Sequence, residues 1–146
     1  MLNKINHFLA TGFYSGYLPA APGTWGSLLM VVLIFFFPLL NNIYLLSALT
    51  IGGVAVANFE ERQTGIKDDG RIVIDEIAGQ LLTFYTLPTT LPVLVGGFIL
   101  FRLFDITKPW LIDKVQNLPS GWGVMMDDIL AGLTSLIILK IILTLI

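Results

Sequence analysis

The 146-residue chain has no cysteine, a single histidine (His7) and few charges. Without thiols it has neither a thiolate nucleophile nor a cysteine metal site, and one histidine excludes schemes that require two. Only 12% of the residues are charged, whereas ordinary soluble domains have about 25%. Because 55% of the residues are hydrophobic, this deficit indicates a membrane protein. The net charge of -2 is too small to indicate a nucleic-acid partner.

Long uncharged segments account for this composition and predict membrane helices. Residues 27–40 and 43–59 carry no charge and are separated by the polar turn Asn41-Asn42, which predicts two antiparallel spanning helices. A further apolar run covers residues 129–146 apart from one lysine. No repeat or linker divides the chain. The sequence therefore predicts one membrane-embedded domain over residues 1–146, an all-α bundle of about four to five membrane helices.

Residues 77–101 are also uncharged, but they contain Pro88 and Pro92. Two interpretations follow: a single kinked helix, or a helical hairpin with the prolines at its tip. Seven of the eight Lys and Arg residues lie in three segments: 1–26, 60–76 and 102–128. A hairpin would place these segments on one side of the membrane, whereas a single span would separate them. Since Lys and Arg concentrate on the cytoplasmic side, their distribution favours the hairpin, with this side facing the cytoplasm.

Two pairs of neighbouring acids, Asp75-Glu76 and Asp127-Asp128, lie against apolar runs. Carboxylates in such positions are costly and commonly hold a cation. If the two pairs converge, their oxygen atoms would suit Mg²⁺, which binds a few carboxylates, water and substrate phosphate. Asp68 and Asp69 are further candidate ligands, although Asp69-Gly70 also suits a turn. For Asp127-Asp128 the alternative is that the acids open the last helix and complement its dipole.

Three cations, Arg71, Arg102 and Lys108, are candidates for binding phosphate, because guanidinium and ammonium groups donate charged hydrogen bonds. If residues 101–108 are helical, Arg102, Asp105 and Lys108 share one face of the helix. The alternative for Arg102 is therefore an ion pair with Asp105.

Residues 12–27 contain four glycines and two prolines, which predicts a shaped loop rather than a regular helix. Its backbone N–H groups and the hydroxyls of Thr24 and Ser27 would lie at the start of a spanning helix, where anions bind well. A bent entry into the membrane is the alternative. Together these features predict a metal ion and a phosphate meeting at the membrane surface. Catalysis would then use metal-activated water or a carboxylate nucleophile.

Four motifs follow one another along the chain: Gly12-x3-Gly16-x2-Pro19-x2-Pro22-Gly23-Thr24-x-Gly26-Ser27, Ile72-Val73-x-Asp75-Glu76, Phe101-Arg102-x-Phe104-Asp105-x2-Lys108-Pro109-Trp110 and Gly123-Val124-Met125-x-Asp127-Asp128. In this order they resemble the motifs of the phosphatidylglycerophosphatase A family. The resemblance implies a small integral protein of the bacterial inner membrane, a Mg²⁺-dependent phosphatase that converts the phospholipid phosphatidylglycerophosphate to phosphatidylglycerol. Two departures lie beside the motifs: Lys67, where a histidine is frequent, and Leu111, where a proline is usual.

The resemblance and the chemistry of the residues together predict roles for individual side chains. We expect catalytic roles for Asp75, Glu76, Asp105 and Lys108. The expected metal ligands are Asp75, Glu76, Asp127, Asp128 and Asp68, and the expected substrate-binding residues are Arg102, Arg71, Thr24 and Ser27.

Two other functions fit the sequence less well. A CDP-alcohol phosphotransferase shares Asp69-Gly70, but the Ala-Arg and the spaced aspartates that should follow are absent. A non-catalytic carrier of divalent cations would place its acids near mid-membrane, whereas here they lie near segment ends. The sequence leaves the number of metal ions, the nucleophile and the oligomeric state open.

Overall fold

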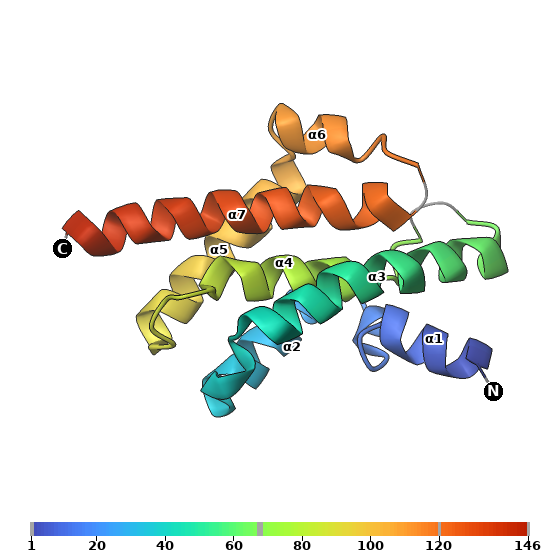
Figure 1. The fold of residues 1–146 in the computed structure, drawn as a ribbon, viewed down its shortest axis with the longest axis horizontal. Coiled ribbons are helices and arrows are strands. Elements are labelled where there is room, and N and C mark those ends of the chain that lie inside the picture. The colour runs from blue at the N-terminus through green and yellow to red at the C-terminus, as the bar shows by residue number, and fades with distance from the viewer. Residues whose placement is uncertain (1, 67–68, 120, 146) are drawn as a thin grey trace.

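The computed structural model describes residues 2–66, 69–119 and 121–145, and all regular elements in these ranges are helical (Figure 1). The all-α class predicted from the sequence is confirmed for these ranges. The elements are α1 (Leu2–Ala10), the 3-10 helix η1 (Ser15–Tyr17), α2 (Pro22–Phe36), the 3-10 helix η2 (Pro38–Leu40), α3 (Ile43–Thr64), α4 (Ile74–Phe84), α5 (Leu91–Thr107), α6 (Leu111–Val115) and α7 (Gly121–Leu145).

Helix α4 is the core of the bundle. Nine of its eleven residues are buried, and α2, α3, α5 and α7 pack around it (Figure 1). At 1.5 Å per residue α4 is only about 16 Å long, roughly half the thickness of a hydrocarbon core. The Val73 N–H donates to the Ala10 carbonyl over 2.9 Å, which ties the start of α4 to the end of α1. The acids at the start of α4 are therefore surrounded by protein and not by lipid-facing sequence.

The segment 77–101 forms a hairpin, as the charge distribution favoured. Helix α4 ends at Phe84 and α5 begins at Leu91. The two run antiparallel, because Gly79 lies against Phe101 and Gly97 lies against Phe84. Pro92 is not at the tip, however. It occupies the first turn of α5, where its missing N–H would have had no helical partner in any case.

The last helix begins earlier than predicted. It starts at Gly121, six residues before Asp127. Gly121 lies against the backbone of α3 at Val54, a closeness that leaves no space for a Cβ atom. Asp127 and Asp128 consequently lie beyond the first turn of α7. The prediction that they open the helix is wrong, and an interaction with the helix dipole fades at that depth.

Helix α2 also begins earlier than predicted, at Pro22 instead of Ser27, so only residues 12–21 form the loop. Within the described ranges, two helices are long and apolar enough to cross a membrane: α3 with 22 residues and α7 with 25. Helix α2 is apolar but shorter. The fold thus supports association with a membrane, and the larger count of four to five membrane helices stays a prediction.

The charged segments meet at one end of the bundle. The Asn6 side chain of α1 donates to the Glu60 carboxylate of α3 over 2.9 Å. Lys108, just after α5, forms an ion pair with Asp127 of α7. The first contact joins α1 to the end of α3, and the second joins the end of α5 to α7. The start of α4 connects the two, because Val73 is hydrogen-bonded to Ala10 of α1 and the carboxylates of Asp75 and Glu76 lie close to that of Asp128.

Candidate metal and phosphate site

A close crossing of α4 and α7 brings the two acid pairs together. Gly79 of α4 lies against the Asp128 backbone, and Gly132 of α7 lies against the Gly79 carbonyl. A Cβ atom at either glycine would overlap these backbone atoms, so only glycine permits the contact. Asp75 precedes Gly79 by one helical turn, and Asp128 precedes Gly132 by one turn. The glycines therefore set the distance between the acids.

Three carboxylates form a cluster at this crossing: Asp75, Glu76 and Asp128. One oxygen atom from each lies within 4.8 Å of the other two. Asp75 is 8% exposed and Asp128 is 2% exposed. Among the described residues, no Lys or Arg forms an ion pair with these three acids. Two of their buried oxygen atoms, Asp75 Oδ1 and Glu76 Oε2, have no hydrogen-bond partner.

This donor set suits a hard divalent cation. Buried carboxylates at such short separations repel one another, and an unpaired buried charge is costly. Carboxylate oxygens are also the ligands that Mg²⁺ and Ca²⁺ prefer. The residues present therefore fit a metal ion, with Asp75, Glu76 and Asp128 as its ligands.

The other two buried acids nearby have cationic partners. Arg102 and Asp105 form an ion pair within α5, which is the alternative stated above for Arg102. Lys108 and Asp127 form a second pair between α5 and α7. Lys108 adopts a left-handed conformation, with φ at 40°, and caps α5 instead of extending it. Asp127 also accepts a 3.1 Å hydrogen bond from the Asp128 N–H, so it lies beside the cluster without being one of its three members.

The start of α2 adjoins the cluster. Gly23 is buried, and a Cβ atom there would overlap Glu76 Oε1 and lie 3.0 Å from Arg102 Nη1. The first turn of a helix carries a partial positive charge that attracts anions. In α2 Pro22 has no N–H and the Thr24 N–H donates to the Ala21 carbonyl over 3.0 Å, so the Gly23 N–H is the donor that this turn offers. Thr24 belongs to this first turn and is partly exposed. Ser27 is fully buried and donates to the Gly23 carbonyl over 2.8 Å, so its hydroxyl proton is used inside the helix.

Arg71 lies apart from this arrangement. Its guanidinium donates to both oxygens of Asp69, with Nε–Oδ1 at 2.9 Å and Nη2–Oδ2 at 2.5 Å, and it lies 5.7 Å from the centre of the Tyr17 ring. The hydrogen bonds from Arg71 lower the pKa of Asp69 below its usual value. Asp69 thus serves the turn before α4, which was the alternative for this acid. Asp68 lies outside the described residues.

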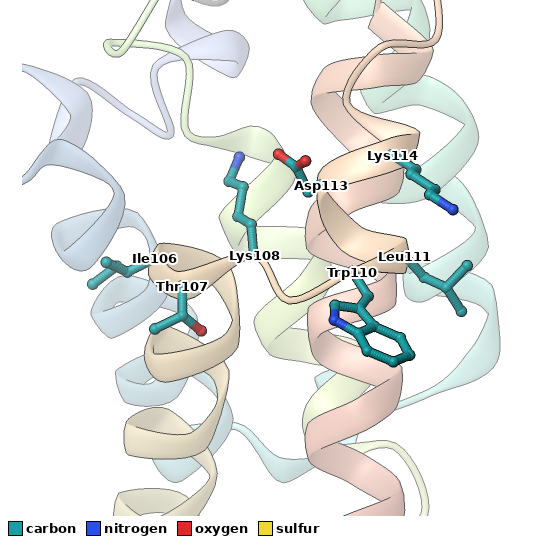
Figure 2. Close-up of a pocket in the computed structure, with 7 residues that line it drawn as sticks. All are labelled: Ile106, Thr107, Lys108, Trp110, Leu111, Asp113 and Lys114. Carbon is teal, nitrogen blue, oxygen red and sulfur yellow. The ribbon is translucent and has the colours of Figure 1, made fainter.

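An open pocket of about 750 Å³ adjoins the site through Lys108 (Figure 2). In Figure 2 Lys108 extends away from Trp110 and Leu111, which point outward from the other side of the same turn. Trp110 is 89% exposed, and large exposed aromatic residues are typical of the membrane–water interface. The remaining lining residues are Ile106, Thr107, Asp113 and Lys114.

Two polar features of the structure were not predicted. His7 contacts Glu60 over 2.5 Å and Tyr17 over 2.7 Å, which ties α1 to α3 and to the following loop. Gln80 of α4 is fully buried, and neither its amide nitrogen nor its amide oxygen has a partner. The sequence signal for Gln80 was a single amide in an apolar run, one turn after Glu76.

The fold and the site define a helical protein that has, among its described residues, two helices apolar enough to span a membrane and a carboxylate cluster beside a helix N-terminus and an arginine. Comparison with known families assigns residues 8–143 to phosphatidylglycerophosphatase A. The chain belongs to this family of phosphoric monoester hydrolases, which confirms the resemblance noted from its motifs.

Curated relatives are similar over nearly the whole chain. A phosphatidylglycerophosphatase A from Escherichia coli K12 is 39% identical, covering 88% of this chain and 78% of the relative. One from Haemophilus influenzae is 38% identical, covering 94% and 88%. A putative phosphatidylinositol-3-phosphatase from Bacteroides thetaiotaomicron is 38% identical, covering 91% and 90%. No solved structure matches the chain.

Proposed function

We propose that the protein hydrolyses the terminal phosphomonoester of phosphatidylglycerophosphate to give phosphatidylglycerol, and that it requires Mg²⁺. The observation that carries this proposal is the cluster of Asp75, Glu76 and Asp128, two buried acids and one partly buried acid that form no ion pair among the described residues. Gly23 and Arg102 lie on one side of this cluster, where a phosphate can approach. The names of two relatives specify the same substrate.

Each group of residues in the site has a separate role. Asp75, Glu76 and Asp128 hold the metal ion. When bound, Mg²⁺ supplies positive charge to the phosphoryl oxygens and lowers the pKa of a coordinated water. The Arg102 guanidinium and the Gly23 N–H at the start of α2 orient the phosphate oxygens, with the Thr24 hydroxyl at the edge of the same turn.

The two ion pairs complete the site. Asp105 fixes the direction of the Arg102 guanidinium, and Asp127 fixes that of the Lys108 ammonium. Lys108 lines the open pocket (Figure 2), so its positive charge is available to the oxygen on which negative charge develops as the ester bond breaks. Arg71 lies apart from this site and is paired with Asp69, so we assign it to the turn before α4. Ser27 is assigned to helix packing.

The substrate reaches this site from the bilayer. Large hydrophobic side chains of α3, α5 and α7 are exposed, including Ile51 at 72%, Ile99 at 59% and Ile137 at 50%. Exposed apolar faces of this extent on apolar helices suit acyl chains as neighbours. We propose a multi-pass protein of the bacterial inner membrane whose polar end faces the cytoplasm, in accord with its Lys and Arg residues.

One relative is named for phosphatidylinositol 3-phosphate, which is also a lipid phosphomonoester. The deciding experiment measures phosphate release by the purified protein in detergent micelles from each lipid, with Mg²⁺ and with excess EDTA. We expect Mg²⁺-dependent release, faster from phosphatidylglycerophosphate. Faster release from the inositol lipid would change the proposed headgroup but not the reaction. Release that is unaffected by EDTA would contradict the role given to the carboxylates.

A further inference from the structure

Gln80 has the least satisfied side chain in the described core. It is 0% exposed, and its Nε2 and Oε1 atoms both lack hydrogen-bond partners. Buried polar groups are almost always hydrogen-bonded, because leaving them unpaired is costly. A bound water or ligand is the usual reason that such a group is retained.

The position of Gln80 on α4 places its amide beside the metal and phosphate site. Glu76, Gln80 and Phe84 follow one another at intervals of four residues and so share one face of the helix. At one end of this face, Glu76 lies beside Gly23, and so does Arg102 of α5. At the other end, Phe84 lies against Gly97 of α5. The face is therefore directed toward α5. Since side chains on a helix lean toward its N-terminus, the Gln80 amide lies on the Glu76 side.

The unpaired atoms in this region are complementary. Glu76 Oε2 and Gln80 Oε1 are acceptors without donors, whereas Gln80 Nε2 and Arg102 Nε are donors without acceptors. No direct hydrogen bond joins any of these atoms to another. Bridging water molecules would satisfy all four, because water both donates and accepts.

We propose that Gln80 is a positioning residue that holds Glu76 in its metal-binding orientation and links it to Arg102. Gln80 Nε2 donates to a buried water, which donates to Glu76 Oε2 and leaves Oε1 directed at the metal. Arg102 Nε donates to a second water, which donates to Gln80 Oε1. The amide thereby couples the ligand of the cation to the group that binds phosphate. This inference rests on the proposed function, since it requires Glu76 to be a metal ligand.

The test replaces Gln80 with methionine, which has a similar length and no hydrogen-bonding amide. Binding of Mn²⁺ to the detergent-solubilised full chain is measured by electron paramagnetic resonance, which needs no substrate or turnover. Loss of a group that orients a metal ligand typically weakens metal affinity about 10–100-fold. We expect Gln80→Met to weaken Mn²⁺ binding by such a factor and to raise the Mg²⁺ concentration for half-activation in parallel. Turnover at saturating Mg²⁺ should stay within a few-fold of the parent value.

Thr83 offers a matched control on the same helix. It is fully buried and polar, but its hydroxyl donates to the Gly79 carbonyl over 3.0 Å, so its hydrogen bond is complete within the helix. Thr83→Val should bind Mn²⁺ as the parent does. Asp75→Asn supplies the opposite control and should remove tight binding.

The outcomes separate this inference from the proposed function. If the parent and Asp75→Asn bind Mn²⁺ equally, the metal site itself is misplaced. If Asp75→Asn loses Mn²⁺ but Gln80→Met binds it within two-fold of the parent, the role of Gln80 is overturned and the metal site stands. If neither Gln80→Met nor Gln80→Leu folds while Thr83→Val does, Gln80 serves the fold and not Glu76, which also overturns the inference.

Discussion

Neutralising Asp128 should abolish activity and yet stabilise the metal-free protein. Its carboxylate lies within 4.8 Å of those of Asp75 and Glu76. At this separation and an effective dielectric constant of about 20, each ionised pair repels by about 3.5 kcal/mol. In the absence of metal the acids can bind protons, which relieves much of this repulsion. We therefore expect Asp128→Asn to raise the free energy of unfolding by on the order of 1–2 kcal/mol, less than the full repulsion. The loss of a metal ligand should reduce turnover about 100-fold or more.

The assay compares thermal unfolding in detergent with EDTA and with Mg²⁺, followed by phosphate release. The parent should unfold at a higher temperature with Mg²⁺, because a ligand that binds only the folded state stabilises it. Asp128→Asn should unfold a few degrees above the parent in EDTA, and Mg²⁺ should raise its unfolding temperature little.

Asp105→Asn is the matched contrast, because this buried acid has a cationic partner in Arg102. Its neutralisation leaves a largely buried guanidinium unpaired and should lower the unfolding temperature in EDTA. If Asp128→Asn instead lowers stability in EDTA as Asp105→Asn does, or retains activity within a few-fold of the parent, the cluster does not hold a metal ion.

Three further predictions concern packing and topology. Gly23→Ala should reduce phosphate release at least ten-fold with little loss of stability, because the new methyl group displaces Glu76 and Arg102, whose side chains can move. Gly132→Ala should lower the unfolding temperature by several degrees and also reduce Mn²⁺ affinity, because it pushes the α7 backbone away from the Gly79 carbonyl; unchanged metal affinity would show that the crossing does not set the site. Single cysteines at Thr64 and Asn117, in a chain with none of its own, should react with an impermeant reagent from the cytoplasmic side only; labelling from opposite sides would contradict the single polar end.

The features that the sequence predicted correctly are those that depend on local composition. The charge-free runs indicated helices, and Pro88 marked the turn between α4 and α5. The starts of α2 and α7 were placed too late, because glycine is usually taken as a signal against helix. At Gly121 the absence of a side chain permits contact with the α3 backbone, and this tertiary contact outweighs the low helix propensity of glycine.

The sequence could identify the acids of the site but not divide them into pairs and ligands. Asp127 and Asp128 are neighbours in the chain, yet Lys108 reaches only the first as an ion-pair partner. That contact depends on the left-handed cap at Lys108 and on the way α5 crosses α7. The periodicity of the sequence predicts neither feature. Gln80 was missed for a related reason. A lone amide in an apolar run has meaning only once its lack of a hydrogen-bond partner is known.

The division between paired and unpaired acids explains why a chain this apolar retains five buried or partly buried carboxylates in one region. Asp105 forms an ion pair with Arg102, and Asp127 forms one with Lys108. The positive charges of these two residues are therefore balanced at the site. Asp75, Glu76 and Asp128 have no such partners among the described residues, and they lie where α4 is enclosed by four other helices. Enclosure by protein excludes the lipid that would make these charges prohibitive, and it also keeps bulk water from weakening their attraction for a cation. The short helix at the centre of the bundle thus provides an enclosed position for the proposed metal ion that a longer, lipid-exposed span could not offer.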